Sequence, residues 1–216
     1  MDLPEIEIAS HPLLDAGLFV TRFPSELGEL SAAAIFSELF KLETNAPFQS
    51  NDRIKSSVRD LFRHSGFKPT GRNKPASEYL IKAASEDRLS SINPAVDFCN
   101  IVSLHCGLPI SVVDLEKTDG LLVIQPAPQD TSYVFNVSGQ EIQVDGLICL
   151  FDEQGACANA VKDSQRTKTS DTTTQTLNII WGTNELPEYC GQAQQWYQKL
   201  LQDFGAEILE VSPITR

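Results

Sequence analysis

The chain has 216 residues, of which 41% are hydrophobic and 21% are charged, and its formal net charge is −12. This length and hydrophobic content predict one folded domain over residues 1–216 and exclude a disordered or fibrous protein. No window approaches the roughly 18 consecutive apolar residues of a membrane span, and the N-terminal MDLPEIEIAS lacks the basic start and apolar run of a signal peptide, so we expect a cytoplasmic protein without a membrane partner.

The cysteines are odd in number, and no two of them form a C-x-x-C pair. Both features argue against a disulfide framework and against a structural zinc site. We therefore expect buried free thiols, no bound metal and no cofactor. The residues concerned are Cys99, Cys106, Cys149, Cys157 and Cys190.

The positive charges are unevenly distributed along the chain. Between Arg53 and Arg88 there are nine Lys and Arg against four Asp and Glu, so this segment carries +5 and the remainder of the chain −17. Such segregation permits a local anionic ligand, such as the end of a tRNA, on an otherwise acidic body. An ordinary pair of solvated helices is the alternative. The candidate RNA-binding side chains here are Arg53, Arg59, Arg63, Lys68, Arg72 and Lys74.

The first half of the chain is predicted to be mainly helical. Apolar residues at helical spacing and the positions of Pro and Gly define the segments. Asn93 is an expected N-cap, with Pro94 at the first helical position. The expected elements are a strand at 17–23 and helices at 28–42, 50–64, 76–84 and from residue 94 onward, with a basic loop, FKPTGRNKP, before the helix at 76–84.

The second half changes to short β-rich segments bounded by turn residues. The polar stretch DSQRTKTSDTTTQ (163–175) is long for a loop in a compact domain, which is typical of a functional or mobile segment. Helices first and mostly antiparallel strands afterwards predict an α+β fold, with a barrel-like or sandwich sheet core and with N-terminal helices and a C-terminal helix packed around it. Strands are expected at 121–127, 132–137, 141–144, 146–151 and 177–182, followed by a helix near 186–204 and a strand, EILEV.

The helix that starts at Pro94 is apolar on nearly every side, so we expect it to lie deep in the fold. Asp97 and Asn100 are three residues apart and share one edge of it. Because an unpartnered buried polar group costs a few kcal/mol, both side chains need hydrogen bonds. Asp97 is expected to fix a nearby loop by accepting backbone N–H groups. Asn100 is the candidate for a pocket, since an amide both donates and accepts.

The same region carries a family resemblance. The run NPAVDFCNIVSL, then GLP, then VDLEK, resembles the tRNA-binding and editing domain of the phenylalanyl-tRNA synthetase beta subunit. The upstream FKPTGRNKPASEYLIKAASEDRLSSIN and the downstream GLLVIQPA, SGQEI and LNIIWG fit a free-standing version of that domain. The resemblance covers roughly residues 50–182 and is strongest at 92–117.

The resemblance implies hydrolysis of tyrosine wrongly attached to the phenylalanine tRNA, without a protein nucleophile or a metal. Water would attack the aminoacyl ester, positioned by side chains and backbone. The family's Thr-Asn pair corresponds to Cys99 and Asn100, its Pro to Pro109, its His to Ser111, its Ala-Gly wall to Ala158 and Asn159, and its tyrosine-reading Glu to Ile180. Asn100 and Ser111 are thus the candidate catalytic residues, and the others are candidates for the substrate pocket.

Two of these correspondences depart from the family pattern. The side chain of Ile180 cannot hydrogen-bond to a substrate hydroxyl. Either the alignment with the family is shifted in this loop, or the accepted amino acid is a different one, apolar or smaller. Ser111 cannot act as a general base as His might, although a hydroxyl can orient water. His105, at the end of the helix, is expected to be a surface or capping residue, and Cys99 a small pocket or core side chain rather than a nucleophile.

Two principal functions remain open from the sequence. The first is hydrolysis in trans of mischarged tRNA, with its acceptor end bound by the basic helices and by Arg166 and Lys168 of the loop. The second is a non-catalytic domain that binds RNA, an amino acid or a translation protein and keeps the fold without the chemistry. A general small-molecule hydrolase is weaker, because the sequence contains no Ser-His-Asp grouping or metal signature.

Overall fold

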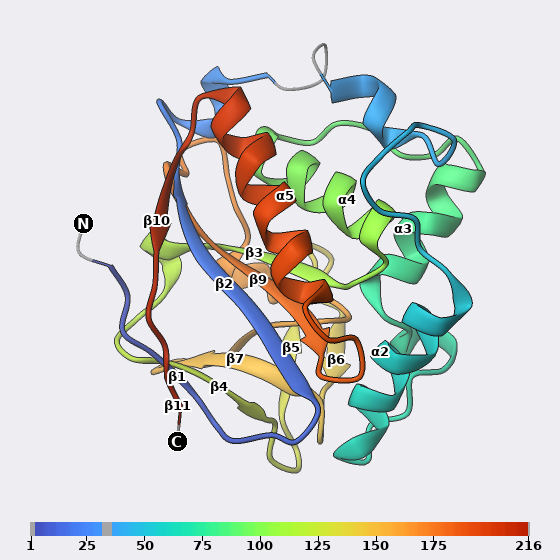
Figure 1. Ribbon diagram of the computed structural model, residues 1–216. Helices are drawn as coiled ribbons and strands as arrows, with labels where there is room; N and C mark the ends of the chain where they lie inside the picture. The colour runs from blue at the N-terminus through green and yellow to red at the C-terminus, as the bar shows by residue number, and fades with distance from the viewer. Residues whose placement is uncertain (1–2, 32–35, 216) are drawn as a thin grey trace.

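A computed structural model describes residues 3–31 and 36–215. Two main β-sheets form the body of the molecule, and the helices gather on one side of it (Figure 1). Most strand pairs are antiparallel, and the sheets formed by the described strands do not close into a barrel. The α+β prediction is therefore confirmed, with a sandwich-like core.

The first sheet has five strands in the order β11-β1-β4-β7-β8. Strand β1 pairs in parallel with both β11 and β4, whereas β4, β7 and β8 are antiparallel. The pairing of β1 with β11 places residues 6–8 and 214–215 side by side (Figure 1). The strands are β1 (Ile6–Ile8), β4 (Leu122–Pro126), β7 (Ile148–Asp152), β8 (Gly155–Asn159) and β11 (Ile214–Thr215).

The second sheet has four antiparallel strands in the order β10-β2-β9-β3. Its two long central strands pair along their whole length, from Leu14 opposite Thr183 to Arg22 opposite Gln175. Strand β9 is buried almost throughout, including its polar residues Thr176, Asn178 and Thr183. The strands are β2 (Leu14–Arg22), β3 (Ile110–Asp114), β9 (Gln175–Thr183) and β10 (Glu207–Glu210).

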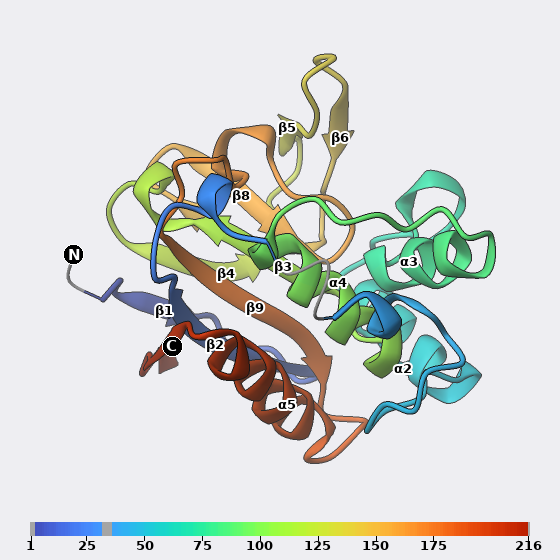
Figure 2. The same ribbon diagram turned by 90° about the horizontal axis from the view of Figure 1, so that it is seen from above.

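The helices cover this second sheet and extend beyond it. Helix α5 (Tyr189–Phe204) packs on β2 and β9, and α4 (Pro94–Cys106) packs between α5, β3 and α3. Helix α3 (Ala76–Ser85) packs on α4, and helix α2 (Asp52–His64) contacts β9 and lies beside α3 (Figure 2). Helix α4 is therefore surrounded, as its apolar circumference predicted.

A separate hairpin stands out from the body of the molecule (Figure 2). Its strands are β5 (Ser132–Val134) and β6 (Glu141–Gln143), and its tip contains Gly139 at φ 74°, which an L side chain rarely adopts. Ser138 and Gly139 lie between the two strands expected at 132–137 and 141–144, so they form the turn of this hairpin.

The helix expected at 28–42 is not continuous in the described part of the chain, and residues 32–35 lie outside it. Two short 3-10 turns are found instead, η1 (Leu27–Glu29) and η2 (Ser37–Phe40). The backbone is extended at Leu30 (φ −107°, ψ 149°) and at Lys41 (φ −99°, ψ 136°), which ends each short turn. The N–H groups of Leu27 and Gly28 donate to carbonyls of the 171–173 loop at 3.0 and 2.8 Å, which holds η1 against that loop.

Candidate functional site

A cavity of about 700 Å³ opens between α3, the first half of α4, strand β3 and the loop that follows β8. Its walls are largely apolar, with Leu80 from α3, Val96 from α4, and Ile110 and Val112 from β3. Its polar groups are contributed by Asn93, Asn100, Asp163 and Thr169, and its cations by Arg72, Lys162 and Lys168. An apolar cavity with a few convergent polar groups is the usual form of a small-ligand site.

Asn100 reaches this cavity from α4. The helix begins where the Asn93 side chain caps the N–H of Val96 at 3.1 Å, and Pro94 occupies the first turn. Asn100 is half-buried, and its amide has no hydrogen-bond partner among the described residues. An amide so placed is available to a substrate or a water.

Asp97, the other polar residue on this edge, has the structural role that its position predicted. Its carboxylate accepts the N–H of Ile92 at 2.8 Å and the hydroxyl of Ser91 at 2.5 Å. Burial raises its pKa, and these two bonds oppose the shift. Asp97 thus holds the segment before α4, which contributes Ile92 and Asn93 to the cavity.

Asp163 is the titratable acid of the cavity. Its Oδ1 accepts a bond from the Ser111 hydroxyl at 2.7 Å and from the N–H of Asn159 at 3.1 Å. Within the described chain no side-chain donor is bonded to Oδ2. Burial raises the pKa of this carboxyl to about 6, while its hydrogen bonds and Lys168 oppose the shift. Asp163 is therefore ionised at neutral pH but markedly more basic than an ordinary aspartate.

Ser111 lies behind Asp163 rather than in the cavity. It is fully buried on β3, accepts the indole N–H of Trp181 at 2.9 Å, and donates towards Asp163. The sequence proposed that this hydroxyl orients water directly. Because the Ser111 hydroxyl is buried, it does not reach the cavity. It instead bonds to the Asp163 carboxylate, which faces the cavity.

Asn159 shapes the turn that presents Asp163. Its side-chain oxygen accepts the N–H groups of Val161 at 2.7 Å and Lys162 at 3.0 Å. Its backbone N–H donates to Asp163, and its carbonyl accepts from Ser111 at 3.2 Å. Because these backbone groups are already bonded and the residue is buried, they are not open to an ester as the sequence had suggested.

The remaining predicted pocket residues divide between cavity and core. Cys99 lines the cavity, and burial raises the pKa of its thiol well above the ordinary value, so it carries no nucleophilic thiolate. Pro109, Ala158 and Ile180 are buried and do not line the cavity. Ile180 pairs with Ile110 inside the second sheet, so its apolar character reflects core packing and not the choice of substrate.

His105 also differs from its expected place. It is 3% exposed, and its Nε2 lies 2.8 Å from the carbonyl of Leu39. Burial lowers its pKa. This histidine is therefore a packed residue between α4 and η2, not a surface cap. All five cysteines are buried free thiols, as expected.

The cations at the cavity come from three places. Arg72 belongs to the short turn η3 (Gly71–Asn73), is exposed, and has no hydrogen bond or ion pair in the described structure. Lys162 has a lowered pKa, because of burial and of the nearby Arg72. Lys168 donates to the carbonyl of Phe135 at 2.5 Å. Of the predicted RNA-binding residues, Arg72 and Lys168 therefore lie at the cavity.

The other predicted RNA-binding residues lie elsewhere. Arg59 makes two bonds to Glu78, at 2.6 and 2.7 Å, that join α2 to α3, and Arg63 pairs with Asp60 at 2.7 Å. Arg53, Lys68 and Lys74 are not among the residues that line this cavity.

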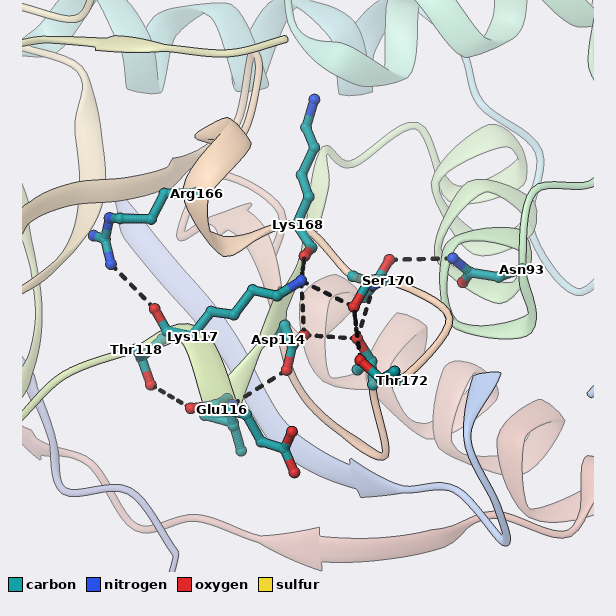
Figure 3. A network of polar contacts seen from close by, with 12 residues as sticks. Asn93, Asp114, Glu116, Lys117, Thr118, Arg166, Lys168, Ser170 and Thr172 are labelled. Atoms are coloured by element: carbon teal, nitrogen blue, oxygen red, sulfur yellow. Dashed lines mark hydrogen bonds and ion pairs between the residues drawn. The ribbon is translucent and has the colours of Figure 1, made fainter. Parts of the chain in front are cut away.

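Arg166 has a structural partner. It forms two bonds of 2.7 Å to Asp152, whose side chain is fully buried, and a third to the carbonyl of Lys117. The predicted phosphate contact is thus replaced by an ion pair that fixes the polar loop to β7. Lys168, by contrast, extends its side chain away from this network (Figure 3).

A second network fixes the same loop to the end of β3. The ammonium of Lys117 lies 3.1 Å from the buried carboxylate of Asp114 and donates to the carbonyl of Lys168 at 2.6 Å and the hydroxyl of Ser170 at 3.1 Å (Figure 3). Thr173 also donates to Asp114, at 2.6 Å. The long polar loop is therefore anchored, and the position of Asp163 at its start is well defined.

Asp163 was missed from the sequence, although a signal existed. It directly follows the buried strand GACAN and opens the polar stretch DSQRTKTSDTTTQ. A carboxylate at the junction between a buried strand and a functional loop is a candidate site residue. Its partner Ser111 is 52 residues away, so only the fold brings the two together.

The described residues contain no group of three or more His, Cys, Asp or Glu placed to hold a metal ion. None of the helices in the described ranges has the length and apolar character needed to cross a membrane.

Comparison with known proteins places the chain in a family. The model of the B3/4 domain matches residues 66–185, which is more than half of the sequence. The chain belongs to the B3/4 domain family. The matched region contains every residue that lines the cavity, from Arg72 to Thr169. The B3/4 domain thus includes the complete candidate site.

The fold of this B3/4 protein is also found in a solved structure. An N-terminal fragment of the phenylalanyl-tRNA synthetase beta subunit from Pyrococcus horikoshii matches with a TM-score of 0.51 and 8% sequence identity. The match covers 100% of this chain and 54% of that chain. No curated protein sequence matches the chain. The resemblance inferred from the sequence is confirmed for family and fold.

Proposed function

We propose that this protein hydrolyses the ester of a mischarged aminoacyl-tRNA in trans, using a water positioned in the cavity between α3 and α4. The observation that carries the proposal is the Asp163 carboxylate, which has a raised pKa and faces an apolar cavity of about 700 Å³ together with the unpartnered amide of Asn100. Membership of the B3/4 family and the synthetase-like fold support a tRNA substrate.

The chemistry assigned to the cavity is a single water attack. A water held between Asp163 and Asn100 adds to the ester carbonyl carbon, and Asp163 accepts the proton that the water loses. The bond from that carbon to the ribose oxygen then breaks, and the proton passes to the leaving ribose oxygen. Ser111 is the positioning residue, because it fixes Asp163 Oδ1 through a 2.7 Å bond.

The cavity walls favour an apolar amino acid. Leu80, Val96, Ile110 and Val112 offer no hydrogen-bonding side chain, and Asn100 and Asp163 are assigned to the water. The other polar side chains there are already bonded: the Asn93 amide donates to Thr169 at 3.2 Å, and the Tyr79 hydroxyl donates to the carbonyl of Gly71 at 3.1 Å. A site without a free partner does not select a hydroxyl-bearing side chain over an apolar one. The accepted amino acid is therefore proposed to be aliphatic or phenyl-bearing rather than one read through its hydroxyl.

The cations at the cavity supply the RNA contacts. Arg72, Lys162 and Lys168 are proposed to hold phosphates of the acceptor end, which positions the ester beside Asp163 without reading sequence. The strong negative charge of the rest of the chain restricts RNA to this face.

Binding without chemistry is the second candidate function. One observation favours it: among the described residues that line the cavity, none is a His or a Glu. In that case the same cavity would hold an amino acid or the aminoacylated end of a tRNA without turnover.

A panel of deacylation assays distinguishes hydrolysis from binding without chemistry. Several misacylated tRNAs are incubated with wild type, Asn100→Ala, Asp163→Asn and the control Gln195→Ala, which changes an exposed amide on α5. We expect wild type and control to deacylate at least one species, and the two site variants to lose about 100-fold in kcat while remaining folded. Inactivity of wild type across the panel, with retained binding, would instead establish the second function.

A further inference from the structure

A second, polar groove adjoins the cavity. It has a volume of about 690 Å³ and lies between the turn η3 and the hairpin formed by β5 and β6. Arg72 and Lys162 line both hollows, so the two hollows border each other at this pair of cations. The first hollow is mainly apolar, whereas six of the eight residues that line the second are polar or charged. An extended ligand that occupies both would pass between Arg72 and Lys162.

Neither of the two shared cations forms an ion pair with a described residue. Arg72 has neither an ion pair nor a hydrogen bond in the described part of the chain, and the ammonium of Lys162 lies over the Phe135 ring at 4.0 Å from its centroid. Their mutual repulsion contributes to the lowered pKa of Lys162. An anion placed between them would relieve this repulsion, and a phosphodiester is an anion that joins two parts of one ligand.

The walls of the groove are fixed in place. The Tyr133 hydroxyl donates to the carbonyl of Lys162 at 2.5 Å, and Lys168 donates to the carbonyl of Phe135 at 2.5 Å, so the hairpin is held against the loop after β8. On the other wall, the hydroxyl of Tyr79 donates to the carbonyl of Gly71 at 3.1 Å. The hollow is thus built by specific contacts on both sides.

The groove offers hydrogen bonds to a neutral group. The amides of Asn73 and Gln143 line it and have no side-chain hydrogen bonds in the described structure. Such amides donate and accept at once, which suits the edge of a nucleobase. Glu141 also lines the groove, and its carboxylate disfavours a second phosphate there. The lining therefore suits one phosphate at the cationic end and an uncharged base beyond it.

We propose that this groove is a subsite for the nucleotide that precedes the terminal adenosine of the acceptor end, with the linking phosphate between Arg72 and Lys162. This assignment rests on the proposed function, because it assumes that the first cavity takes the aminoacylated adenosine. The hairpin then acts as one wall of a nucleotide site.

The test compares two small esters on the full chain. One is the misacylated adenosine, and the other is the same amino acid on cytidylyl-(3′–5′)-adenosine. The measured quantity is the ratio of kcat/KM for the second ester to kcat/KM for the first. Equilibrium binding of unacylated cytidylyl-adenosine and of adenosine is measured in parallel, so that recognition is recorded even without turnover. The variants are Arg72→Gln, Gln143→Ala and the control Lys199→Gln, which removes an exposed charge on α5.

We expect a ratio of about ten in wild type and in Lys199→Gln, with parallel ratios in affinity. Arg72→Gln should bring both ratios to near one, and Gln143→Ala should reduce them by about threefold.

Turnover of the adenosine ester with no gain from the added nucleotide would overturn the groove assignment and leave the proposed function standing. Inactivity with every ester, combined with an Arg72-dependent gain in affinity, would overturn the proposed function while supporting the groove. An equal loss in Lys199→Gln would also overturn the groove, since it would show general electrostatics.

Discussion

At the residue scale, the proposed chemistry depends on the ionised form of Asp163. The pKa of this carboxyl is about 6, so the fraction able to accept a proton falls as the pH drops below that value. After subtraction of uncatalysed ester hydrolysis, we expect kcat to fall tenfold per pH unit below about 6 and to level off above it. Asp163→Asn should lower the plateau and remove the dependence. A wild-type profile that stays flat between pH 5 and 7 would contradict the assignment of Asp163 as the base.

The same carboxylate should reduce stability. Its folded-state pKa of about 6 lies above the ordinary value of 3.8, so the folded state binds the proton more tightly and stability declines as the pH rises from about 4 to about 6. At pH 7.5 the full cost is present, on the order of 3 kcal/mol. We therefore expect Asp163→Asn to raise Tm at pH 7.5 and to have little effect at pH 4. The exposed Asp171→Asn is the matched control, with unchanged Tm at both values.

Ser111 should act through Asp163 and not through the substrate. Its bond to the carboxylate opposes the upward shift in pKa, so Ser111→Ala should raise the pKa of Asp163 further. The acid limb of the pH–rate profile should then move to higher pH, which a purely structural residue would not cause. The variant also leaves the buried indole N–H of Trp181 unpaired, so we expect a loss of about 1–3 kcal/mol in unfolding free energy by urea denaturation.

Residue-level prediction from sequence succeeded where local spacing was sufficient. Helical periodicity placed Asn100 on the edge of a buried helix next to an acid that fixes a loop, and Asn93 capped that helix as expected. It failed for Ser111 and Asp163, because their contact joins strand β3 to the loop after β8, and the sequence does not show that these two segments are neighbours. Ile180 was misjudged for a related reason, since a core position and a pocket position both appear as an apolar residue in a strand.

At the element scale, the loop after β8 is held by ion pairs instead of being a free cationic arm. Arg166 pairs with Asp152, whose side chain is fully buried. Removing one partner of such a pair leaves an uncompensated charge, so Arg166→Met should destabilise the protein by roughly 2–4 kcal/mol. The exposed pair of Arg63 with Asp60 offers a control, in which Arg63→Met should cost about 0.5 kcal/mol or less.

A double variant tests whether the pair of Arg166 with Asp152 is structural. Adding Asp152→Asn to Arg166→Met removes the orphaned charge while keeping an acceptor oxygen near the N–H groups of Asp119 and Gln154, and it should restore part of the lost stability. If Arg166 instead contacts RNA, Arg166→Met would retain its Tm and lose affinity for the acceptor end in a salt-dependent manner.

Long periodic segments were predictable as elements, and short ones were not. Helices α2, α3 and α4 begin and end close to their expected positions, because caps and Gly or Pro mark them. Strands β1, β3, β8 and β11 have two to five residues, which is too short for a periodic pattern to stand out, so they were missed. The helix expected at 28–42 had helical spacing, but the backbone is extended at Leu30 and Lys41 and interrupts it.

At the scale of the whole molecule, the net charge of −12 and a tRNA partner are compatible only if few phosphates are contacted. The cavity offers three cations, Arg72, Lys162 and Lys168, whereas Arg59, Arg63 and Arg166 are paired internally.

For a single-stranded end the logarithm of affinity falls by about 0.7 per neutralised phosphate for each unit of log salt. Three contacts therefore predict a slope of about −2 in an acceptor-end titration between 50 and 300 mM salt. Arg72→Gln should reduce the slope by about 0.7, and Arg53→Gln should leave it unchanged because that residue lies outside the cavity. A slope steeper than about −4 would mean that the helices α2 and α3 bind RNA along their outer faces, as the charge distribution in the sequence first suggested.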